Sequence, residues 1–314
     1  MIARTKDIIM EAEREGYAVG AFNFNDLEFL QAIIEAAEKE RSPVIVATTE
    51  GALKHMGNGD PILGLRVAYS MFEKLARSVK VPVSIHLDHG KHFDVIVSAM
   101  KVGYSSVMID LSDRPFEENL KGTKRIVEIA HTIGVSVEAE LGRILGKEDD
   151  VVSREEILVD PKEAKIFVEK TGVDFLAPAV GTKHGAFKFE GEAKLDFERL
   201  KSVKELTGIP LVLHGASMVP QDWVKIANDY GADIGGAKGV PEDVLKRAIE
   251  FGIRKVNIDT DLRISFIASL RKFFKENKKE IDPRKYLGEG RKAVVEVVRE
   301  RLRILGSSGK ANIS

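Results

Sequence analysis

Three of the seven histidines stand directly before a glycine, in the pairs His89-Gly90, His184-Gly185 and His214-Gly215. A lone histidine near a strand end is usually structural, but three with small neighbours are better explained as metal ligands that leave room for a substrate. Three neutral imidazoles with one open position describe a catalytic zinc site, which can polarise a carbonyl or activate water. Other divalent metals would fit, and thiolate ligands are excluded because the chain has no cysteine.

Asp88 stands immediately before the first of these histidines, near the end of the stretch 81–90. The apolar, β-branched residues of this stretch predict a buried strand that is entered through Pro82. Because α/β proteins place their chemistry at such strand ends, Asp88 is a candidate for moving a proton beside the metal. The alternative is a strand that simply runs into a turn. Strand alternation places His86 on the face opposite His89, so we expect His86 to be structural.

Other expected strands also end in polar side chains. Asp110 ends the fourth, Glu138 and Glu140 end the fifth, and Asn257 and Asp259 end the last. If these strands are parallel neighbours, the carboxyl ends of all of them lie at one edge of the sheet. The sequence therefore predicts that acids and an amide surround the three histidines.

Glycines and hydroxyls recur in the segments after the last three strands, at 181–185, 215–217 and 257–260. Late loops of this kind commonly bind phosphate through backbone N–H groups and hydroxyls such as those of Ser217 and Thr260. Any one of them could be an ordinary glycine turn, but together they favour a phosphate site. A metal beside a phosphate site favours a phosphorylated sugar as substrate.

Short apolar strands alternate with helical patterns along the chain. Eight strands are expected, at 18–24, 43–49, 81–90, 106–111, 135–141, 175–180, 210–215 and 255–260. Near-continuous apolar strands belong to a parallel sheet covered on both faces, and eight βα units in succession predict a (β/α)8 TIM barrel of the α/β class. The alternative, an open doubly wound sheet, would carry a phosphate-binding glycine cluster in its first βα turn, and residues 23–26 contain none.

Length and composition are consistent with one globular unit. No linker or repeat divides the 314 residues, so we expect a single domain over 1–314 with a C-terminal helical extension at about 262–305. The formal net charge of -1 gives no reason to expect nucleic acid or a membrane surface as partner. The chain has no apolar run of membrane-spanning length and no signal-peptide core at its start, so a cytoplasmic location is expected.

The ordered motifs resemble the class II, metal-dependent fructose-1,6-bisphosphate aldolases along nearly the whole chain. The similar segments are VGAFN at 19–23, HLDHG at 86–90, SVMID at 106–110, PFEEN at 115–119, VEAELG at 137–142, GTKHGA at 181–186, LVLHGAS at 211–217, VNIDTDL at 256–262 and DPRKY at 282–286. The resemblance implies reversible cleavage of fructose 1,6-bisphosphate to dihydroxyacetone phosphate and glyceraldehyde 3-phosphate, a reaction of glycolysis and gluconeogenesis. It also implies a homo-oligomer, a dimer or a tetramer.

The resemblance also implies a role for each site residue. It makes His89, His184 and His214 the ligands of Zn²⁺, with Asp110 and Glu140 at a second metal position. Asp88 would deprotonate the C4 hydroxyl, Glu148 would exchange the C1 proton from a loop that closes over the substrate, and Asn257 would lie near the reacting carbons. The remaining substrate and phosphate contacts it implies are Asn23, Thr49, Gly185, Lys188, Gly215, Ala216, Ser217, Ile258, Asp259, Thr260 and, from a neighbouring subunit, Arg284. Whether a monovalent cation accompanies the phosphate stays open.

Three other activities compete with this interpretation. A tagatose-1,6-bisphosphate aldolase would share the fold and metal but tends to have alanine where this chain has Asp259. A lysine-dependent aldolase would use Lys183 and resist chelators. A zinc hydrolase of the barrel type would need a His-x-His pair where this chain has Asn23 and Asn25. Asp113 and Lys183 depart from the usual family pattern, and the sequence gives Asp113 no role.

Overall fold

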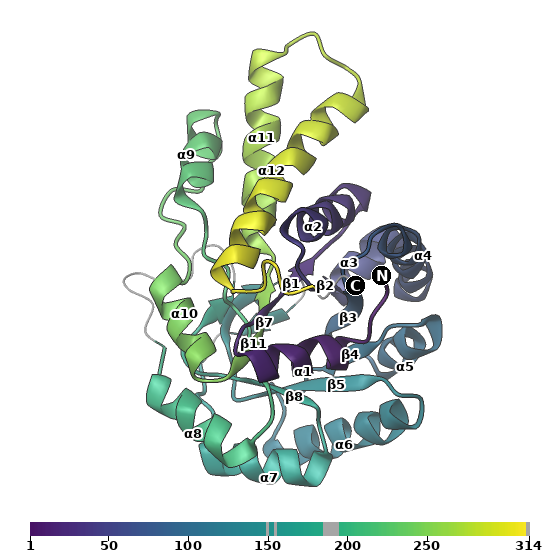
Figure 1. Cartoon of the computed structure of the whole chain (residues 1–314), viewed down its shortest axis with the longest axis vertical. Helices are drawn as coiled ribbons and strands as arrows, with labels where there is room; N and C mark the ends of the chain where they lie inside the picture. Colours follow the sequence, from purple (N-terminus) through teal and green to yellow (C-terminus); the bar gives the residue numbers. More distant parts are fainter. Residues whose placement is uncertain (149–150, 154–155, 185–194, 312–314) are drawn as a thin grey trace.

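The computed structural model describes residues 1–148, 151–153, 156–184 and 195–311, and its main sheet is a closed parallel barrel (Figure 1). Around the barrel the strand order is β1-β11-β10-β8-β5-β4-β3-β2. Their bounds are β1 (Val19–Asn23), β2 (Val44–Thr48), β3 (Val83–Gly90), β4 (Ser106–Ile109), β5 (Ser136–Leu141), β8 (Phe175–Pro178), β10 (Leu211–Leu213) and β11 (Ile253–Ile258). The predicted TIM barrel and its eight strands are therefore confirmed.

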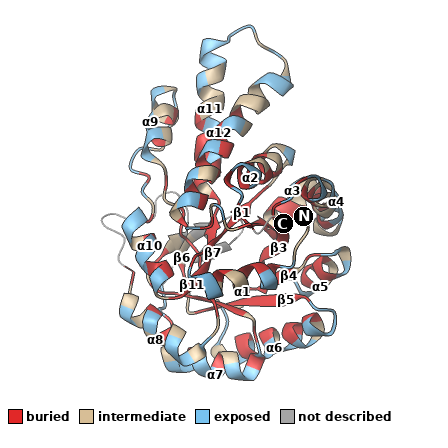
Figure 2. Ribbon diagram, in the orientation of Figure 1, coloured by how far each residue is buried: buried red, intermediate tan, exposed pale blue. Residues whose placement is uncertain are grey.

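Helices surround this barrel and turn their buried faces toward the strands and their exposed faces outward (Figure 2). Several begin where the sequence supplies a cap; Asp26, for example, accepts a hydrogen bond from the N–H of Phe29 at 2.8 Å. The helices are α1 (Thr5–Glu15), α2 (Leu27–Glu40), α3 (Glu50–Met56), α4 (Pro61–Ser78), α5 (Phe93–Val102), α6 (Phe116–Thr132), α7 (Pro161–Thr171), α8 (Phe197–Thr207), α9 (Gln221–Asp229), α10 (Glu242–Glu250), α11 (Thr260–Glu276) and α12 (Pro283–Ile304). No helix in the described part of the chain combines the length and apolarity needed to cross a bilayer.

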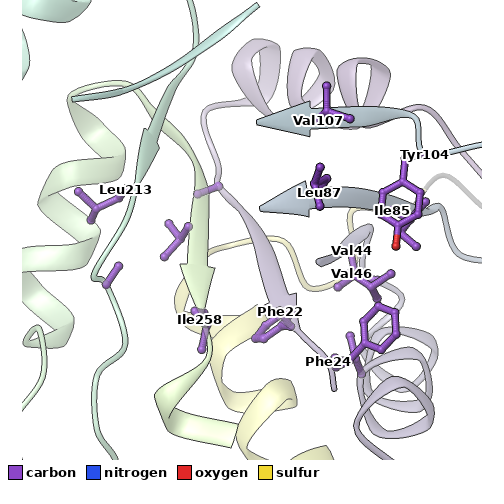
Figure 3. Packing of buried hydrophobic residues seen from close by; sticks show 14 of the residues in the cluster. Phe22, Phe24, Val44, Val46, Ile85, Leu87, Tyr104, Val107, Leu213 and Ile258 are labelled. Carbon is purple, nitrogen blue, oxygen red and sulfur yellow. The ribbon is translucent and has the colours of Figure 1, made fainter. Parts of the chain in front are cut away.

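Alternate residues of each barrel strand face two different environments. One set packs outward under the helices, including Phe22, Ile85, Leu87 and Ile258 (Figure 3). The other set faces the barrel interior. At the end of the barrel that α1 covers, the interior residues of the strands are apolar and cluster with Ile9 of that helix. The polar residues of the interior set therefore collect toward the opposite end, at the carboxyl ends of the strands.

A small three-stranded sheet lies outside the barrel, in the order β7-β6-β9. It consists of β6 (Leu145–Glu148), β7 (Val151–Ser153) and β9 (Lys183–His184). A loop that closes over the substrate is expected around Glu148, and the backbone there forms an antiparallel pair in which Glu148 is opposite Val151. Gly146 pairs with His184, so this sheet holds the backbone after β5 beside the backbone after β8.

Helices α11 and α12 form a hairpin that extends beyond the barrel (Figure 1). At its base, α12 packs against α2 and is held there by Glu40, which accepts hydrogen bonds from Arg299 at 2.8 Å and from Arg303 at 2.6 Å. At its far end, Asp282 caps α12 by accepting from the N–H of Arg284 at 3.0 Å. The hairpin corresponds to the predicted C-terminal helices, and the single-domain organisation stays a prediction.

Candidate metal centre

His89 has a backbone conformation that is unusual for a residue other than glycine. Its φ angle is +48°, in the left-handed region, and the pairing of β3 with β4 shifts register between Leu87 and Gly90. Gly90 allows β3 to lie this close to β4, because a Cβ atom at Gly90 would lie 2.6 Å from the carbonyl oxygen of Met108. The irregularity breaks the strict alternation of β3, so the side chains of both Asp88 and His89 turn toward the site.

Two imidazoles face each other in this buried space. His89 Nε2 lies 3.0 Å from His214 Nδ1. The opposite nitrogen of each ring meets a carboxylate, since His89 Nδ1 is 2.8 Å from Asp110 and His214 Nε2 is 2.7 Å from Glu138. Metal-binding histidines are typically oriented in this way, with one nitrogen on a carboxylate and the other directed at the ion.

The charges around His89 shift its pKa. Burial alone would lower the pKa of His89, but the charge of Asp88 and the hydrogen bond and charge of Asp110 raise that pKa well above its ordinary value. Asp110 is affected in the opposite sense: burial raises its pKa, but His89 and Ser112 lower it well below its usual range. An acidic environment that favours a proton on His89 equally favours a metal cation in its place.

Asp88 is fully buried and held by amides from two other strands. Asn23 Nδ2 donates to one carboxylate oxygen at 3.1 Å, and Asn257 Nδ2 donates to the other at 2.9 Å. Each oxygen of an ionised carboxylate has more than one lone pair, so both remain able to accept a proton from a substrate. Asn23 and Asn257 are thus brought to the site as predicted, and both act on Asp88.

A fully buried lysine supports this arrangement, and the sequence interpretation missed it. Lys255 Nζ donates to Glu138 at 2.8 Å and to the side-chain oxygen of Asn257 at 2.7 Å. Burial raises the pKa of Glu138, but Lys255 and His214 outweigh it and hold that pKa well below its usual range. The sequence contains a pattern that could have identified Lys255, because it lies two residues before Asn257 and strand alternation turns both side chains inward.

The second group of acids lies directly beside His89. Single ligand atoms of His89, Asp110 and Glu140 lie within 4.8 Å of one another, and all three residues are buried. Asn119, from the PFEEN segment, donates to the carbonyl of Glu140 at 3.0 Å and ties α6 to the end of β5. Asp110 and Glu140, the residues predicted for a second metal position, therefore lie beside His89, which also faces His214.

Those predicted phosphate residues that the structure describes lie in the segments after β10 and β11, at the rim. Gly215 has φ +60°, and a Cβ atom there would lie 2.5 Å from the carbonyl of Lys183. The N–H of Asp259 donates to Ser217 Oγ at 3.4 Å, and Thr260 begins α11. The side chains of Ala216 and Ile258 pack into the outer core, so only their backbone groups could face a substrate.

The remaining predicted residues that the structure describes lie at the ends of elements, and some are described only in part. Thr49 caps α3 by accepting from the N–H of Ala52 at 3.2 Å. His184 and Glu148 are described through their backbones in β9 and β6, and Gly185 and Lys188 lie outside the described residues. Arg284 is in α12, with its side chain 88% exposed and paired with Asp282.

The placement predicted for His86 is wrong in one respect. Alternation was expected to turn it away from the site, but the left-handed residue His89 breaks that alternation. His86 lies in the barrel interior, with Nδ1 2.9 Å from Ser106 and Nε2 3.6 Å from Glu138. Burial and the neighbouring charge of Lys255 lower the pKa of His86 to about 3, so its imidazole is neutral.

Comparison with known proteins identifies the family. A sequence model of the family described as fructose-bisphosphate aldolase class-II matches residues 3–310. The chain belongs to this family. It is 50% identical over 313 residues to the fructose-bisphosphate aldolase of Helicobacter pylori, covering 99% of this chain and all of that protein. The fructose-bisphosphate aldolase of Thermus caldophilus is 48% identical over the same length. As a class II aldolase, the chain is a lyase.

Solved aldolase structures share the fold of this class II aldolase. The YdjI aldolase from Escherichia coli K12 has a TM-score of 0.80 and 34% identity, covering 99% of this chain and 100% of that one. A fructose-bisphosphate aldolase from Campylobacter jejuni has a TM-score of 0.78 at 23% identity, a likeness that concerns the fold alone.

Class II aldolases depend on a metal ion, and the donor atoms of this chain fit one. Ligand atoms of Asp88, His89 and His214 lie within 4.8 Å of one another in a fully buried group. The combination of imidazole nitrogens and carboxylate oxygens suits a divalent cation, and zinc is the usual partner of histidine-rich sites that keep one open position. His89 and His214 would hold the ion from strands on opposite sides of the site.

Proposed function

We propose that this class II aldolase catalyses the reversible, zinc-dependent cleavage of fructose 1,6-bisphosphate to dihydroxyacetone phosphate and glyceraldehyde 3-phosphate. One observation carries the proposal: a buried carboxylate, Asp88, is fixed by two amides directly beside the facing ring nitrogens of His89 and His214. A base fixed beside a metal site suits the deprotonation of a hydroxyl whose neighbouring carbonyl the metal polarises.

The residues of the chain divide the proton transfers between them. Asp88 would take the proton of the C4 hydroxyl as the bond between C3 and C4 breaks and the aldehyde product forms. Bound Zn²⁺ would supply positive charge near the carbonyl oxygen that receives the electron pair. Glu148 would return a proton to the carbon that has lost its bond to C4, in the remaining three-carbon fragment. We infer that the segment around Glu148 closes over the substrate. Asn257 would orient Asp88 and lie near the reacting carbons.

His184 would complete the metal site as a third imidazole. Its neighbour Lys183 has a carbonyl that closely approaches Gly215, the residue after His214, which supports this assignment. Asp110 and Glu140 would provide the second position, which shares His89. The phosphate contacts would come from Gly185, Lys188, Gly215, Ala216, Ser217, Ile258, Asp259 and Thr260, with Asn23 and Thr49 as further contacts to the sugar. A monovalent cation near the phosphate and a cytoplasmic location remain predictions.

We also propose that Arg284 serves the active site of a neighbouring subunit. Helix α11 begins at the rim and has 17 residues, so it spans about 25 Å at 1.5 Å per residue. Arg284 is the second residue of α12, and this helix starts at the far end of the hairpin (Figure 1), which supports action on another copy and not on its own site. A homo-oligomer, dimer or tetramer, would bring the two together.

Release of triose phosphate from fructose and tagatose 1,6-bisphosphates, each with and without EDTA, tests the function. We expect faster cleavage of the fructose substrate, loss of activity with EDTA and its recovery on adding Zn²⁺. Faster cleavage of the tagatose substrate would change the assigned substrate and keep the mechanism. Full activity in EDTA, with trapping by borohydride, would overturn the metal-dependent mechanism in favour of a lysine-dependent one.

A further inference from the structure

The loop that follows His214 contains a strained residue. It runs from Gly215 to Val219 and connects β10 to α9. Val219 is 1% exposed and has a φ angle of +54°. The left-handed region is unfavourable for a β-branched residue, so surrounding contacts must hold the loop in this conformation. The same loop carries Ser217, one of the proposed phosphate contacts.

A single buried carboxylate holds two successive N–H groups of this loop. Asp261 lies in the first turn of α11 and has no exposed surface. Its oxygens accept from the N–H of Val219 at 2.7 Å and from the N–H of Met218 at 3.2 Å. Hydrogen bonds to an ionised acceptor are stronger than neutral ones, so Asp261 is well suited to stabilise a strained turn.

The charge of Asp261 is balanced from the C-terminal helix. Arg301 Nε in α12 donates to Asp261 at 2.7 Å, and the two side chains are 2% and 0% exposed. A buried carboxylate needs such a partner, because an unpaired charge in the interior is strongly unfavourable. Arg301, Asp261 and the turn at Met218 and Val219 therefore form one continuous chain of contacts from α12 to the rim.

The carbonyl groups of the loop have separate partners. The N–H of Val240 donates to the carbonyl of Ser217 at 3.1 Å, and Gln221 Nε2 donates to the carbonyl of Val219 at 2.8 Å. Gly239 packs so closely on the other side that a Cβ atom there would lie 2.3 Å from the carbonyl oxygen of Ser217. These contacts fix the position of the loop, and Asp261 fixes the orientation of its last two peptides.

We propose that Asp261 and Arg301 are positioning residues for phosphate binding. The pair holds the loop 215–219 in the conformation that presents Ser217 and the neighbouring backbone N–H groups to a phosphate of the substrate, which makes α12 a support of the phosphate site. This inference rests on the proposed function, because the phosphate belongs to the proposed substrate. A purely structural ion pair would affect the stability of the fold and leave phosphate affinity unchanged.

The variants Asp261→Asn and Arg301→Lys test this role, with Arg303→Met as the matched control. Arg303 lies on the same helix but pairs with Glu40, away from the loop. The measurements are the Kd of inorganic phosphate for the zinc-loaded protein by calorimetry, the metal content, the melting temperature, and KM and kcat for the bisphosphate. Asp261→Asn is nearly isosteric but cannot accept from both N–H groups and from Arg301, so the strained turn loses part of its support.

We expect Asp261→Asn to raise the phosphate Kd and KM by about tenfold, the effect of one lost charge-assisted hydrogen bond. Arg301→Lys keeps the charge and should produce a smaller increase, while kcat and metal content stay close to wild type. The control should lower only the melting temperature. Wild-type phosphate affinity in the variants that fold, or changes equal to those of the control, would overturn the proposal. Wild-type protein that binds phosphate but cleaves no bisphosphate would refute the proposed function separately.

Discussion

At the scale of single residues, the proposed roles assign metal binding and proton transfer to different side chains. Asp88 is held by Asn23 and Asn257, whereas His214 is oriented by Glu138. We therefore expect Asp88→Ala to retain zinc and lose about 10²–10⁴-fold in kcat, the usual contribution of a positioned base. His214→Ala should lose both zinc and activity. Metal analysis and the triose-phosphate assay check this, and metal-independent activity in either variant would contradict the assigned roles.

Lys255 connects these two parts, since it contacts both Glu138 and Asn257. Lys255→Met would leave the buried charge of Glu138 without its cationic partner Lys255, so we expect the free energy of unfolding to fall by about 3–5 kcal/mol. Losing support for a ligand should also weaken metal binding by about 10–100-fold. Urea unfolding and Co²⁺ competition with a chelator measure the two effects. The double variant Lys255→Met/Glu138→Gln should recover most of the stability, and no recovery would show that packing, not charge, dominates.

Residue-level prediction used residue type and position: neighbouring glycines and strand ends singled out His89, His214 and Asp88, which the structure brings together, while their roles stay predictions. It failed for His86, because strand alternation assumes a regular backbone and His89 is left-handed. It also missed Lys255, because a lysine in an apolar strand is ordinarily an exposed residue and its partner Glu138 lies far away in the sequence.

At the scale of elements, Glu40 on α2 anchors the helix α12 that carries Arg301. Burial raises the pKa of Glu40, but hydrogen bonds from Arg303, Ser308 and Arg299 lower it to about 2, against 4.5 for an unperturbed glutamate. A depressed folded-state pKa contributes stability that is present above pH 4.5 and is lost as the pH falls toward 2. Acid should therefore weaken the attachment of α12.

We expect Glu40→Gln to lower the free energy of unfolding by about 1.5–3 kcal/mol at pH 7, because charge-assisted hydrogen bonds are lost. The difference from wild type should shrink as the pH falls from 4.5 toward 2. Urea unfolding at several pH values measures it. The control Glu35→Gln, on the same helix, removes an exposed pair with Lys39 and should cost under about 1 kcal/mol. A difference that grows on acidification would contradict the assigned pKa shift.

The barrel strands could be predicted because each is an apolar run buried on both faces, a pattern that sequence reports directly. The sheet β7-β6-β9 could not, because its strands are only two to four residues long and β6 pairs non-locally with β9. The short α3 (Glu50–Met56), which Thr49 caps, was not predicted from the sequence. The ends of elements and short elements depend on local contacts that periodicity does not contain.

At the scale of the whole molecule, the position of Arg284 predicts that the active site is shared between subunits. Arg284 lies beyond the end of the 17-residue α11, and its side chain is 88% exposed. On the proposal that Arg284 binds a phosphate, a single chain would lack this contact. Arg284→Ala should raise KM about tenfold or more, since a charged hydrogen bond to phosphate is lost.

A mixture of two defective variants distinguishes action in trans from action in cis. Asp88→Ala lacks the base and keeps Arg284, whereas Arg284→Ala lacks the arginine and keeps Asp88. In a randomly mixed dimer, half of the molecules are hybrids with one complete site each, so about a quarter of the wild-type activity at low substrate should return. Each variant carried alone through the same unfolding and refolding is the control. If the mixture has no more activity than the mean of the two controls, or if light scattering finds a monomer, Arg284 does not act across a subunit boundary.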